Sequence, residues 1–326
     1  MKKKIQLSED SYLSDYLGII DSRRKKIQQT EDKLTGSKIS LTDFASAHEY
    51  YGLHFRLGEW VFREWAPNAQ KIYLIGDFSG WQCQEKFRLN RLNEHGDWEL
   101  TIPTDVLHDQ DLYRLHITWE GGEGDRIPAY ARRVVQDPGT NIFNAQVWTS
   151  KYRWKNPHYQ NRHSFLKIYE AHVGMSSEEG RTAGYDHFRK KVLPRIDQAG
   201  YNAIQLMAVQ EHPYYASFGY HVANFFAPSS RFGTPQELKQ LIDEAHDRDI
   251  AVIIDLVHSH SVRNEVEGLS RFDGTEYQYF HAGDRGYHEA WDSRCFDYGK
   301  IPVIHFLLSN TRYWLDEFNV DGFRFD

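Results

Sequence analysis

Apolar residues near the start of the chain recur at close to the period of an α-helix. Over residues 10–34 they are Tyr12, Leu13, Tyr16, Leu17, Ile20 and Ile27. Gly36 follows and can end the run, because glycine adopts the left-handed conformation of a helix end at little cost. The pattern predicts a helical segment, which we expect to lie on the domain that follows.

Residues 50–148 show a different rhythm, with short and partly alternating apolar runs such as 60–65, 71–75 and 112–117. Turn-forming pairs, including Gly76-Asp77 and Gly96-Asp97, separate the runs. Short alternating strands with regular turns predict a β-sandwich. Asp137-Pro138-Gly139 marks a further turn, and a polar linker comes next.

From residue 165 apolar strands alternate with amphipathic helices. The expected strands are 166–170, 203–209, 250–257 and 320–325, and the expected helices begin near Asp186, at Thr234 and at Val303. At Thr234-Pro235-Gln236-Glu237, Thr is a favoured N-cap and Glu can close a capping box. Pro194 is expected to kink its helix or to shift the helix start. Residues 258–302 show no clear period.

Alternating strands and helices predict a parallel β/α fold. A (β/α)₈ barrel takes roughly 250 residues, so residues 165–326 supply its first half, four strands. Such a half leaves an apolar sheet edge bare, and we therefore expect a chain cut short after strand four. The predicted domains are a helical segment at 1–45, the sandwich at 46–150, a linker at 151–164 and the half-barrel at 165–326.

Charge, cysteine spacing and the length of apolar stretches exclude several classes of function. The net charge is −7 at pH 7, which gives no electrostatic reason to bind nucleic acid or an anionic membrane. The two cysteines, Cys83 and Cys295, stand far apart in no metal-type spacing, as expected in a reducing compartment. No stretch approaches the roughly 18 apolar residues of a membrane span. We predict a soluble cytoplasmic protein, and protein partners stay unknown.

Polar residues follow the predicted strands at the edge where barrel active sites lie. Asp255 ends an otherwise apolar strand, and a buried charge is costly unless paired, so we expect His258 or His260 to donate to it. Arg324 and Asp326 are two apart on a strand and face the same side. An ionised carboxylate there suits the nucleophile of retaining glycoside chemistry, and a structural ion pair fits the spacing equally well.

The His258-Ser259-His260 pair has a second interpretation, because two histidines at a strand end can hold a metal ion. That would make the protein a metal-dependent hydrolase. Spacing alone leaves this alternative open.

At these residues the chain resembles the α-amylase superfamily and, within it, the branching enzymes of the eukaryotic type. The resemblance runs in order from about residue 45 to 326 and rests on the segments 201–207, 214–220, 231–235, 255–260, 272–275, 291–294 and 321–326. Residues 50–148 resemble the glycogen-binding module that precedes these barrels, with Gly76-Asp77-Phe78-Ser79-Gly80-Trp81 typical of it.

The resemblance implies a role for each matching residue. Asp326 corresponds to the nucleophile and Arg324 to the arginine that holds it. His260 corresponds to a substrate-binding histidine, Tyr220 to a ring beneath the cleaved sugar, and Asp255 to a structural carboxylate. The implied reaction moves an α-1,4-glucan segment to a sugar 6-hydroxyl by double displacement, with an α-glucan as substrate and no cofactor or metal.

The resemblance also places the family's general-acid Glu and a later His-Asp pair beyond residue 326. We therefore expect residues 1–326 alone to be inactive, because acid catalysis typically contributes about 10²–10⁴-fold. Ser259 stands where many superfamily members carry Asn. Two alternatives stay open: an amylase or debranching hydrolase, and a non-catalytic protein that binds glucan through exposed aromatics such as Trp81 or Trp98.

Overall fold

The computed structural model describes residues 10–326, and the chain divides into two compact units, Met1–Ser46 and Ala47–Asp326. In the first unit a 3-10 turn, Ser11–Tyr16, leads into helix α1, Leu17–Thr35, and then α2, Leu41–Phe44. Gly36 ends α1 in the left-handed conformation, with φ 59°. The helix predicted over 10–34 is confirmed. Residues 1–9 of the expected N-terminal segment lie outside the described residues, and its placement on the next domain stays a prediction.

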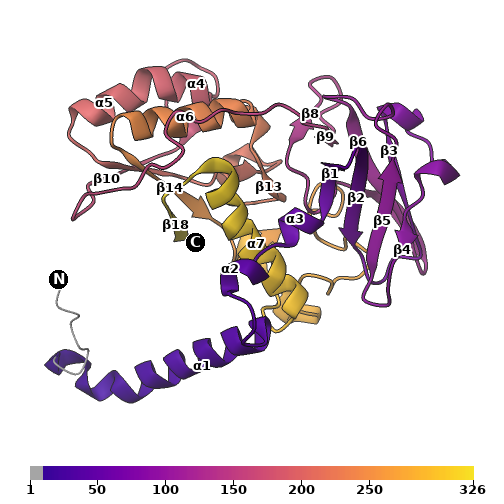
Figure 1. Cartoon of the computed structure of the whole chain (residues 1–326), viewed down its shortest axis with the longest axis horizontal. Coiled ribbons are helices and arrows are strands. Elements are labelled where there is room, and N and C mark those ends of the chain that lie inside the picture. Colours follow the sequence, from indigo (N-terminus) through magenta and orange to yellow (C-terminus); the bar gives the residue numbers. More distant parts are fainter. Residues whose placement is uncertain (1–9) are drawn as a thin grey trace. The chain divides into compact units, whose positions relative to one another are not determined.

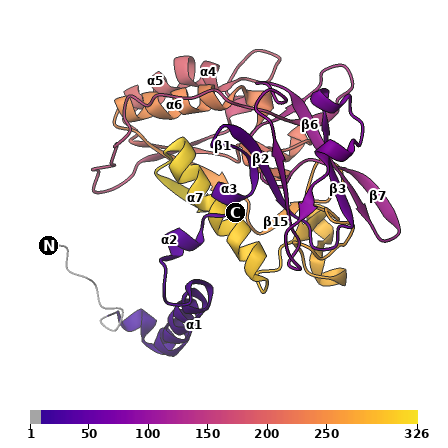
Figure 2. The ribbon, with the colours of Figure 1, turned by 45° about the vertical axis from the view of Figure 1, so that its right-hand side comes forward.

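The second unit opens with α3, Ala47–Tyr50, and a sandwich of two antiparallel sheets (Figures 1 and 2). One sheet has the order β1-β2-β5-β4, with bounds Gly52–Arg56, Glu59–Trp65, Asp97–Ile102 and Asn90–Arg91. The other has the order β3-β6-β9-β8, with bounds Lys71–Gly76, Leu112–Trp119, Phe143–Gln146 and Val134–Gln136, and β7, Gly122–Arg126, pairs with β6. Fully buried residues of both sheets form the core, among them Phe62, Leu74 and Leu115. The sandwich predicted from alternation is confirmed.

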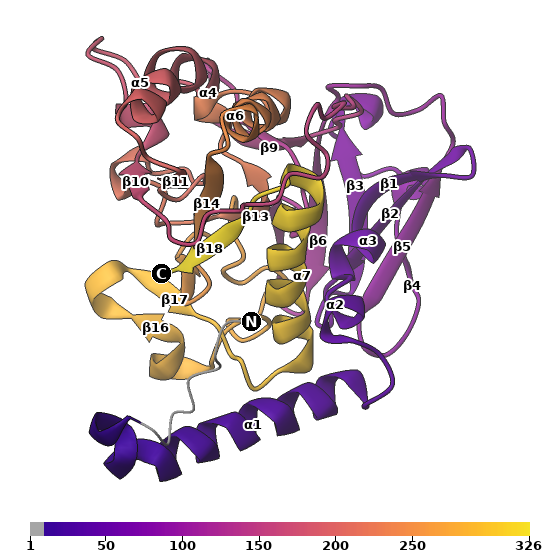
Figure 3. The same cartoon turned by 60° about the vertical axis from the view of Figure 1, so that its left-hand side comes forward.

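A four-stranded parallel sheet follows, in the order β10-β11-β14-β18. Its strands are Ile168–Ala171, Ala203–Leu206, Ala251–Leu256 and Gly322–Phe325. Figure 3 shows helices α4, α5 and α6 together on one side of this sheet, with β18 ending at the C-terminus. The strand order matches the first four strands of a barrel, so the predicted fold class is confirmed.

Two helices of this half-barrel begin at the capping and proline residues that the sequence analysis identified. Helix α6, Pro235–Asp247, is capped by Thr234, whose hydroxyl accepts the Glu237 backbone N–H in a complete capping box. Helix α4, Tyr185–His187, passes through a π-helical stretch, Phe188–Val192, before α5, Leu193–Gln198, begins with Pro194 in its first turn. The expected effect of Pro194 is thus a new helix start. Helix α7 spans Ile301–Phe318.

Short antiparallel strands occupy the loops of the half-barrel, and the sequence pattern did not predict them. A hairpin joins β12, Gln210–Glu211, to β13, Asn224–Pro228. The segment without a period, 258–302, carries a three-stranded sheet of β15, β17 and β16, with bounds His260–Val262, Ser293–Cys295 and Tyr287–His288. Strands of two or three residues hold too few positions for a period to show. Their order comes from pairing across the loop.

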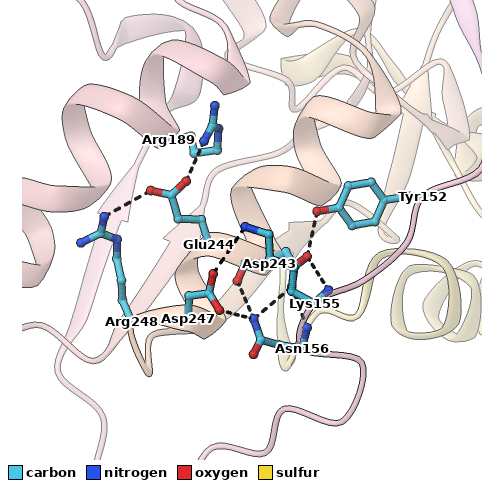
Figure 4. Close-up of polar contacts among 8 residues, drawn as sticks. All are labelled: Tyr152, Lys155, Asn156, Arg189, Asp243, Glu244, Asp247 and Arg248. Atoms are coloured by element: carbon cyan, nitrogen blue, oxygen red, sulfur yellow. Dashed lines mark hydrogen bonds and ion pairs between the residues drawn. The ribbon is translucent and has the colours of Figure 1, made fainter.

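The predicted linker is fastened to α6 through a buried carboxylate (Figure 4). Asp243, 1% exposed, accepts the Tyr152 hydroxyl at 2.8 Å and the backbone N–H groups of Lys155 and Asn156 at 2.9 and 3.0 Å. The Asn156 side-chain amide adds a bond to Asp247 at 2.6 Å. This part of the chain is therefore anchored on the half-barrel, although the exact domain limits stay a prediction.

The sandwich and the half-barrel belong to the same compact unit. The Asn68 backbone N–H donates to Asp273 Oδ2 at 3.0 Å, and the Gln278 side-chain amide donates to the Trp65 carbonyl at 2.6 Å. Both bonds join the sandwich to the loop after β15. None of the helices between residues 10 and 326 combines the length and apolarity that crossing a membrane requires.

Candidate active site

A row of polar side chains crosses the parallel sheet near the carboxyl ends of its strands. The register pairs Glu170 with Gln205 across β10 and β11, and Asp255 with Arg324 across β14 and β18. The Gln205 amide donates to Glu170 Oε1 at 3.1 Å and to Asp255 Oδ1 at 2.8 Å. Because neighbouring parallel strands are only about 4.8 Å apart, side chains on one face meet without bending the backbone. The row links all four strands.

Asp255 is the buried centre of this row, with 0% of its surface exposed. Its Oδ2 accepts the Tyr220 hydroxyl at 2.7 Å and Nη1 of Arg324 at 3.2 Å. Burial raises the pKa of Asp255, while the hydrogen bond from Tyr220 and the Arg324 charge oppose that rise. A buried carboxylate with this many partners holds its neighbours in place, as the structural role implied for Asp255 requires.

Arg324 joins two carboxylates. Its Nη1 lies 3.2 Å from Asp255 Oδ2 and 2.5 Å from Asp326 Oδ1. Desolvation opposes a charge on the guanidinium, but the Asp255 and Asp326 carboxylates raise the pKa of Arg324 overall. The Asp326 side chain stays 25% exposed whereas that of Asp255 is fully buried. The predicted ion pair is confirmed, and of the two carboxylates only that of Asp326 is exposed to solvent.

Tyr220 reaches Asp255 because the segment before it passes close to β11. Gly219 has a φ of +94°, and a Cβ at this position would lie 2.2 Å from the Ala208 carbonyl oxygen. Only glycine fits that combination of conformation and contact. Burial and the hydrogen bond to Asp255 raise the pKa of the Tyr220 phenol, so it stays a donor.

The two histidines do not pair with Asp255, so that expectation was wrong. His258 Nε2 bonds Asn310 Oδ1 of α7 at 2.9 Å, and burial lowers its pKa to about 4. The His260 ring nitrogens bond the Tyr220 carbonyl at 3.0 Å and Ser259 Oγ at 2.9 Å. The physical reason is that other groups already bond the carboxylate: Gln205 and Arg324 from strands β11 and β18, and Tyr220 from the loop before β13. His260 therefore positions the backbone of Tyr220.

The metal alternative rests on the same histidines. Within residues 10–326, the one set of three potential ligand side chains close enough to share an ion is His48, Glu49 and Asp316. It includes neither His258 nor His260. The Arg312 guanidinium pairs with both Glu49 and Asp316 at 2.9 Å. That set is therefore already bridged by a cation of the protein.

Two tryptophans proposed to bind glucan lie in different surroundings. Trp98 is 3% exposed, and its Nε1 donates to the Ala66 carbonyl at 2.9 Å. It is a core residue, so the binding role suggested for it is wrong. Trp81 is 37% exposed, and its Nε1 donates to Asp77 Oδ1 at 3.1 Å. Asp77 also accepts the Leu112 backbone N–H at 2.7 Å, which holds the Trp81 turn on β6.

Gln205 and Glu170 were not predicted as site residues. The available signal was a polar side chain inside an otherwise apolar strand, Ala203-Ile204-Gln205-Leu206. Such a residue needs a buried partner, but periodicity does not say which one. The strand register supplies that answer.

Comparisons with known proteins match both the sandwich and the half-barrel. Residues 50–138 match the family Carbohydrate-binding module 48 (isoamylase N-terminal domain), and residues 190–289 match the α-amylase catalytic domain. The chain is similar to curated proteins named 1,4-alpha-glucan-branching enzyme from Dictyostelium discoideum and Yarrowia lipolytica, each at 44% identity over 98% of this chain. It is also 44% identical, over 97% of its length, to a chloroplastic/amyloplastic branching enzyme 2-2 of Arabidopsis thaliana.

The chain spans about half the length of these relatives, or 48%, 47% and 40% in turn. Two solved structures share its fold with a TM-score of 0.69: a putative α-amylase from Salmonella typhimurium, at 24% identity, and the catalytic module of the pneumococcal protein SpuA, at 19%. The alignments cover 85% and 88% of this chain and 43% and 48% of those chains.

Proposed function

We propose a function on the premise that this chain belongs to the 1,4-alpha-glucan-branching enzymes of the α-amylase superfamily. The protein of which it forms a part transfers an α-1,4-glucan segment to a sugar 6-hydroxyl and so makes α-1,6 branches. The observation that carries the proposal is the Asp326 carboxylate, held by Arg324 at the end of β18 and partly open to solvent. Its substrate is an α-glucan such as glycogen or amylose.

In the first step an Asp326 oxygen forms a bond to the anomeric carbon, and the bond from that carbon to the glycosidic oxygen breaks. The leaving oxygen takes a proton from a general acid, which the family resemblance places beyond residue 326. In the second step a 6-hydroxyl oxygen attacks the same carbon, Asp326 is released and the hydroxyl proton returns to the acid. Two displacements retain the anomeric configuration.

The residues around Asp326 have positioning roles in this proposal. Arg324 orients the carboxylate, since a guanidinium holds an oxygen by charge and by direction together. Asp255 in turn holds Arg324, and Tyr220 and Gln205 hold Asp255. His260, through its bond to the Tyr220 carbonyl, sets the loop that carries Tyr220. Contact of His260 and of the Tyr220 ring with the sugar stays part of the proposal.

The test begins with the nucleotides 3′ of the Asp326 codon, and the complete reading frame is then expressed. With amylose as substrate, we expect a fall in iodine-stain absorbance and new α-1,6 linkages without new reducing ends. Asp326→Asn in the same frame should abolish this activity. New reducing ends would instead indicate an amylase or debranching hydrolase.

A second candidate, a glucan-binding protein without catalysis, is favoured by one observation: Trp81 is exposed on the module matched to a carbohydrate-binding family. A stop codon directly after Asp326, with glycogen binding retained, would favour it. The cytoplasmic location expected from composition also stays a proposal, as does the lack of nucleic-acid and membrane partners.

A further inference from the structure

A cavity of about 370 Å³ lies between the sandwich and the half-barrel, away from the Asp326 site. Arg133, Gln136 and Phe143 line it from the sandwich, and Glu211, Ser230 and Arg231 line it from the half-barrel. The two guanidiniums are the unusual feature, because charged side chains inside a protein normally have a counter-ion.

Arg133 is a buried cation, with 7% of its surface exposed. Its Nη1 donates to the Gly233 carbonyl at 2.7 Å, and its guanidinium lies 5.5 Å from the centre of the Trp148 ring. Its Nε is buried and donates to no described residue. Among the residues 10–326, its side-chain hydrogen bond goes to the Gly233 carbonyl and not to a carboxylate. Burial lowers the pKa of Arg133, and the Glu211 and Glu237 carboxylates oppose that decrease.

Arg231 enters the cavity from the loop after β13, and its surroundings repeat the pattern. Its Nη2 reaches the Pro213 carbonyl at 3.5 Å, which is long for a hydrogen bond. Its guanidinium lies 5.2 Å from the centre of the Tyr215 ring. Its Nη1 is buried and has no acceptor in the described part of the chain. Each of the two guanidiniums that line the cavity thus also has one N–H, shielded from solvent, without an acceptor among the described residues.

Glu211 is the one carboxylate among the lining residues, and its oxygens are already in use. Oε2 accepts the Ser230 backbone N–H at 2.6 Å, and Oε1 accepts the Ser229 hydroxyl at 3.2 Å and the His212 backbone N–H at 3.0 Å. The lining therefore carries two guanidiniums against one carboxylate. An entering group would have to be an anion that accepts several hydrogen bonds.

We propose that this cavity binds a phosphate group, either as inorganic phosphate or as the phosphate monoester of a small sugar. A phosphate offers three or four acceptor oxygens, and guanidiniums hold such oxygens by paired, directed N–H donors. The bound group supplies a counter-ion for both cations. The proposal does not rest on the catalytic function, because it concerns a different set of residues.

The test is isothermal titration of the full 326-residue chain with sodium phosphate and, separately, with glucose 6-phosphate, at constant ionic strength. We expect both probes to bind and to compete. Arg231→Gln removes one cation that is only half-buried and weakly bonded, and it should weaken phosphate binding at least about tenfold. Arg133→Lys keeps the charge but loses the directed N–H donors of the guanidinium plane, and it should weaken phosphate binding comparably.

Arg162→Gln is the matched control, since it removes one positive charge from an exposed position outside the lining. It should bind phosphate like the unmodified chain. Thermal unfolding without phosphate checks that each variant folds. If Arg133→Lys does not fold, the phosphate affinity of Arg231→Gln tests the proposal. If glucose 6-phosphate binds and inorganic phosphate does not, the result would also support the site and would show that the site recognises the sugar. No binding of either probe, or equal weakening in Arg162→Gln, would overturn the proposal.

Discussion

Nη1 of Arg324 lies between two carboxylates, 3.2 Å from Asp255 and 2.5 Å from Asp326. One guanidinium thereby connects a fully buried aspartate to a partly exposed one. The buried partner is itself held by Gln205 and Tyr220. The position of the exposed carboxylate is thus determined by residues on three neighbouring strands and one loop.

Arg324→Lys is expected to lower the branching activity of the complete reading frame by about 100-fold or more, the size of effect seen when one preorganised donor is removed from an active site. A lysine keeps the charge but has no planar fork to reach both aspartates. Iodine-stain assays with amylose measure the loss, and thermal unfolding should change little. Exposed Arg162→Lys serves as control. Unchanged activity in Arg324→Lys would contradict the positioning role.

Residues 1–326 by themselves are expected to show no branching, because the resemblance to the family places its general acid beyond residue 326. The purified chain should leave the iodine-stain absorbance of amylose constant under conditions where the complete frame lowers it. Glycogen binding by the same preparation is the control for folding. Measurable branching by this chain would refute the assignment of a required acid beyond Asp326.

Asp243→Asn is expected to destabilise the second unit by about 3 kcal/mol, since hydrogen bonds to a charged group contribute about 1.5–3 kcal/mol each and Asn offers one acceptor oxygen in place of two. Although desolvation opposes it, the bonds from Lys155, Tyr152 and Asn156 lower the pKa of Asp243 overall. The stabilisation is therefore present above the unfolded pKa, near 4, and is lost as the pH falls through the folded pKa.

Urea unfolding of Asp243→Asn at a series of pH values checks this prediction. The difference from the unmodified chain should be largest near neutral pH and should shrink below about pH 4. Asp105→Asn, at an exposed position, should show no comparable difference at any pH. A destabilisation that does not change with pH would mean that packing, and not the charge, fastens the linker.

Glu64→Gln is expected to stabilise the protein in alkaline solution. Glu64 on β2 has 0% of its surface exposed, and burial raises its pKa to about 8 even though the Trp65 and Ala129 backbone N–H groups oppose the rise. The folded state keeps the proton that the unfolded state has lost. The free energy of unfolding should therefore fall by up to about 1.4 kcal/mol per pH unit between the unfolded pKa and about pH 8. Denaturation of Glu64→Gln should lack this slope, and an identical slope in both proteins would refute the assignment.

Trp81→Ala and Trp98→Ala are expected to separate binding from packing within the sandwich. Trp81→Ala should lower glycogen affinity, measured by affinity electrophoresis, with little change in unfolding. Trp98→Ala should cost about 3–5 kcal/mol of stability, because it empties a space in the core. If Trp81→Ala keeps full glycogen affinity, the exposed ring is not a glucan-binding residue.

Several elements could be predicted from the sequence because their causes are local. The capping box at Thr234 and Glu237 lies within one helical turn, and Pro194 restarts a helix through its own ring. The Arg324 and Asp326 pair needs only the two-residue period of a strand. In the same way, the order of strands and helices after residue 165 indicates half of a barrel, since each strand or helix is recognised by the hydrophobic pattern of its own residues.

Other features could not be predicted because they depend on residues far apart in the chain. His258 and His260 stand near Asp255 in sequence, yet Asn310 and the Tyr220 backbone take their bonds. The small sheet within residues 258–302 has strands too short to show a period.

By itself, the sequence determined the type of each main element and predicted the ion pair between Arg324 and Asp326. The tertiary structure alone decided which partners surround Asp255, how Asp243 holds the linker and where Arg133 and Arg231 share one cavity with a single carboxylate. The physical reason is that helix caps and strand alternation act over a few residues, whereas a buried charge is stabilised by whichever groups the fold brings within hydrogen-bond distance.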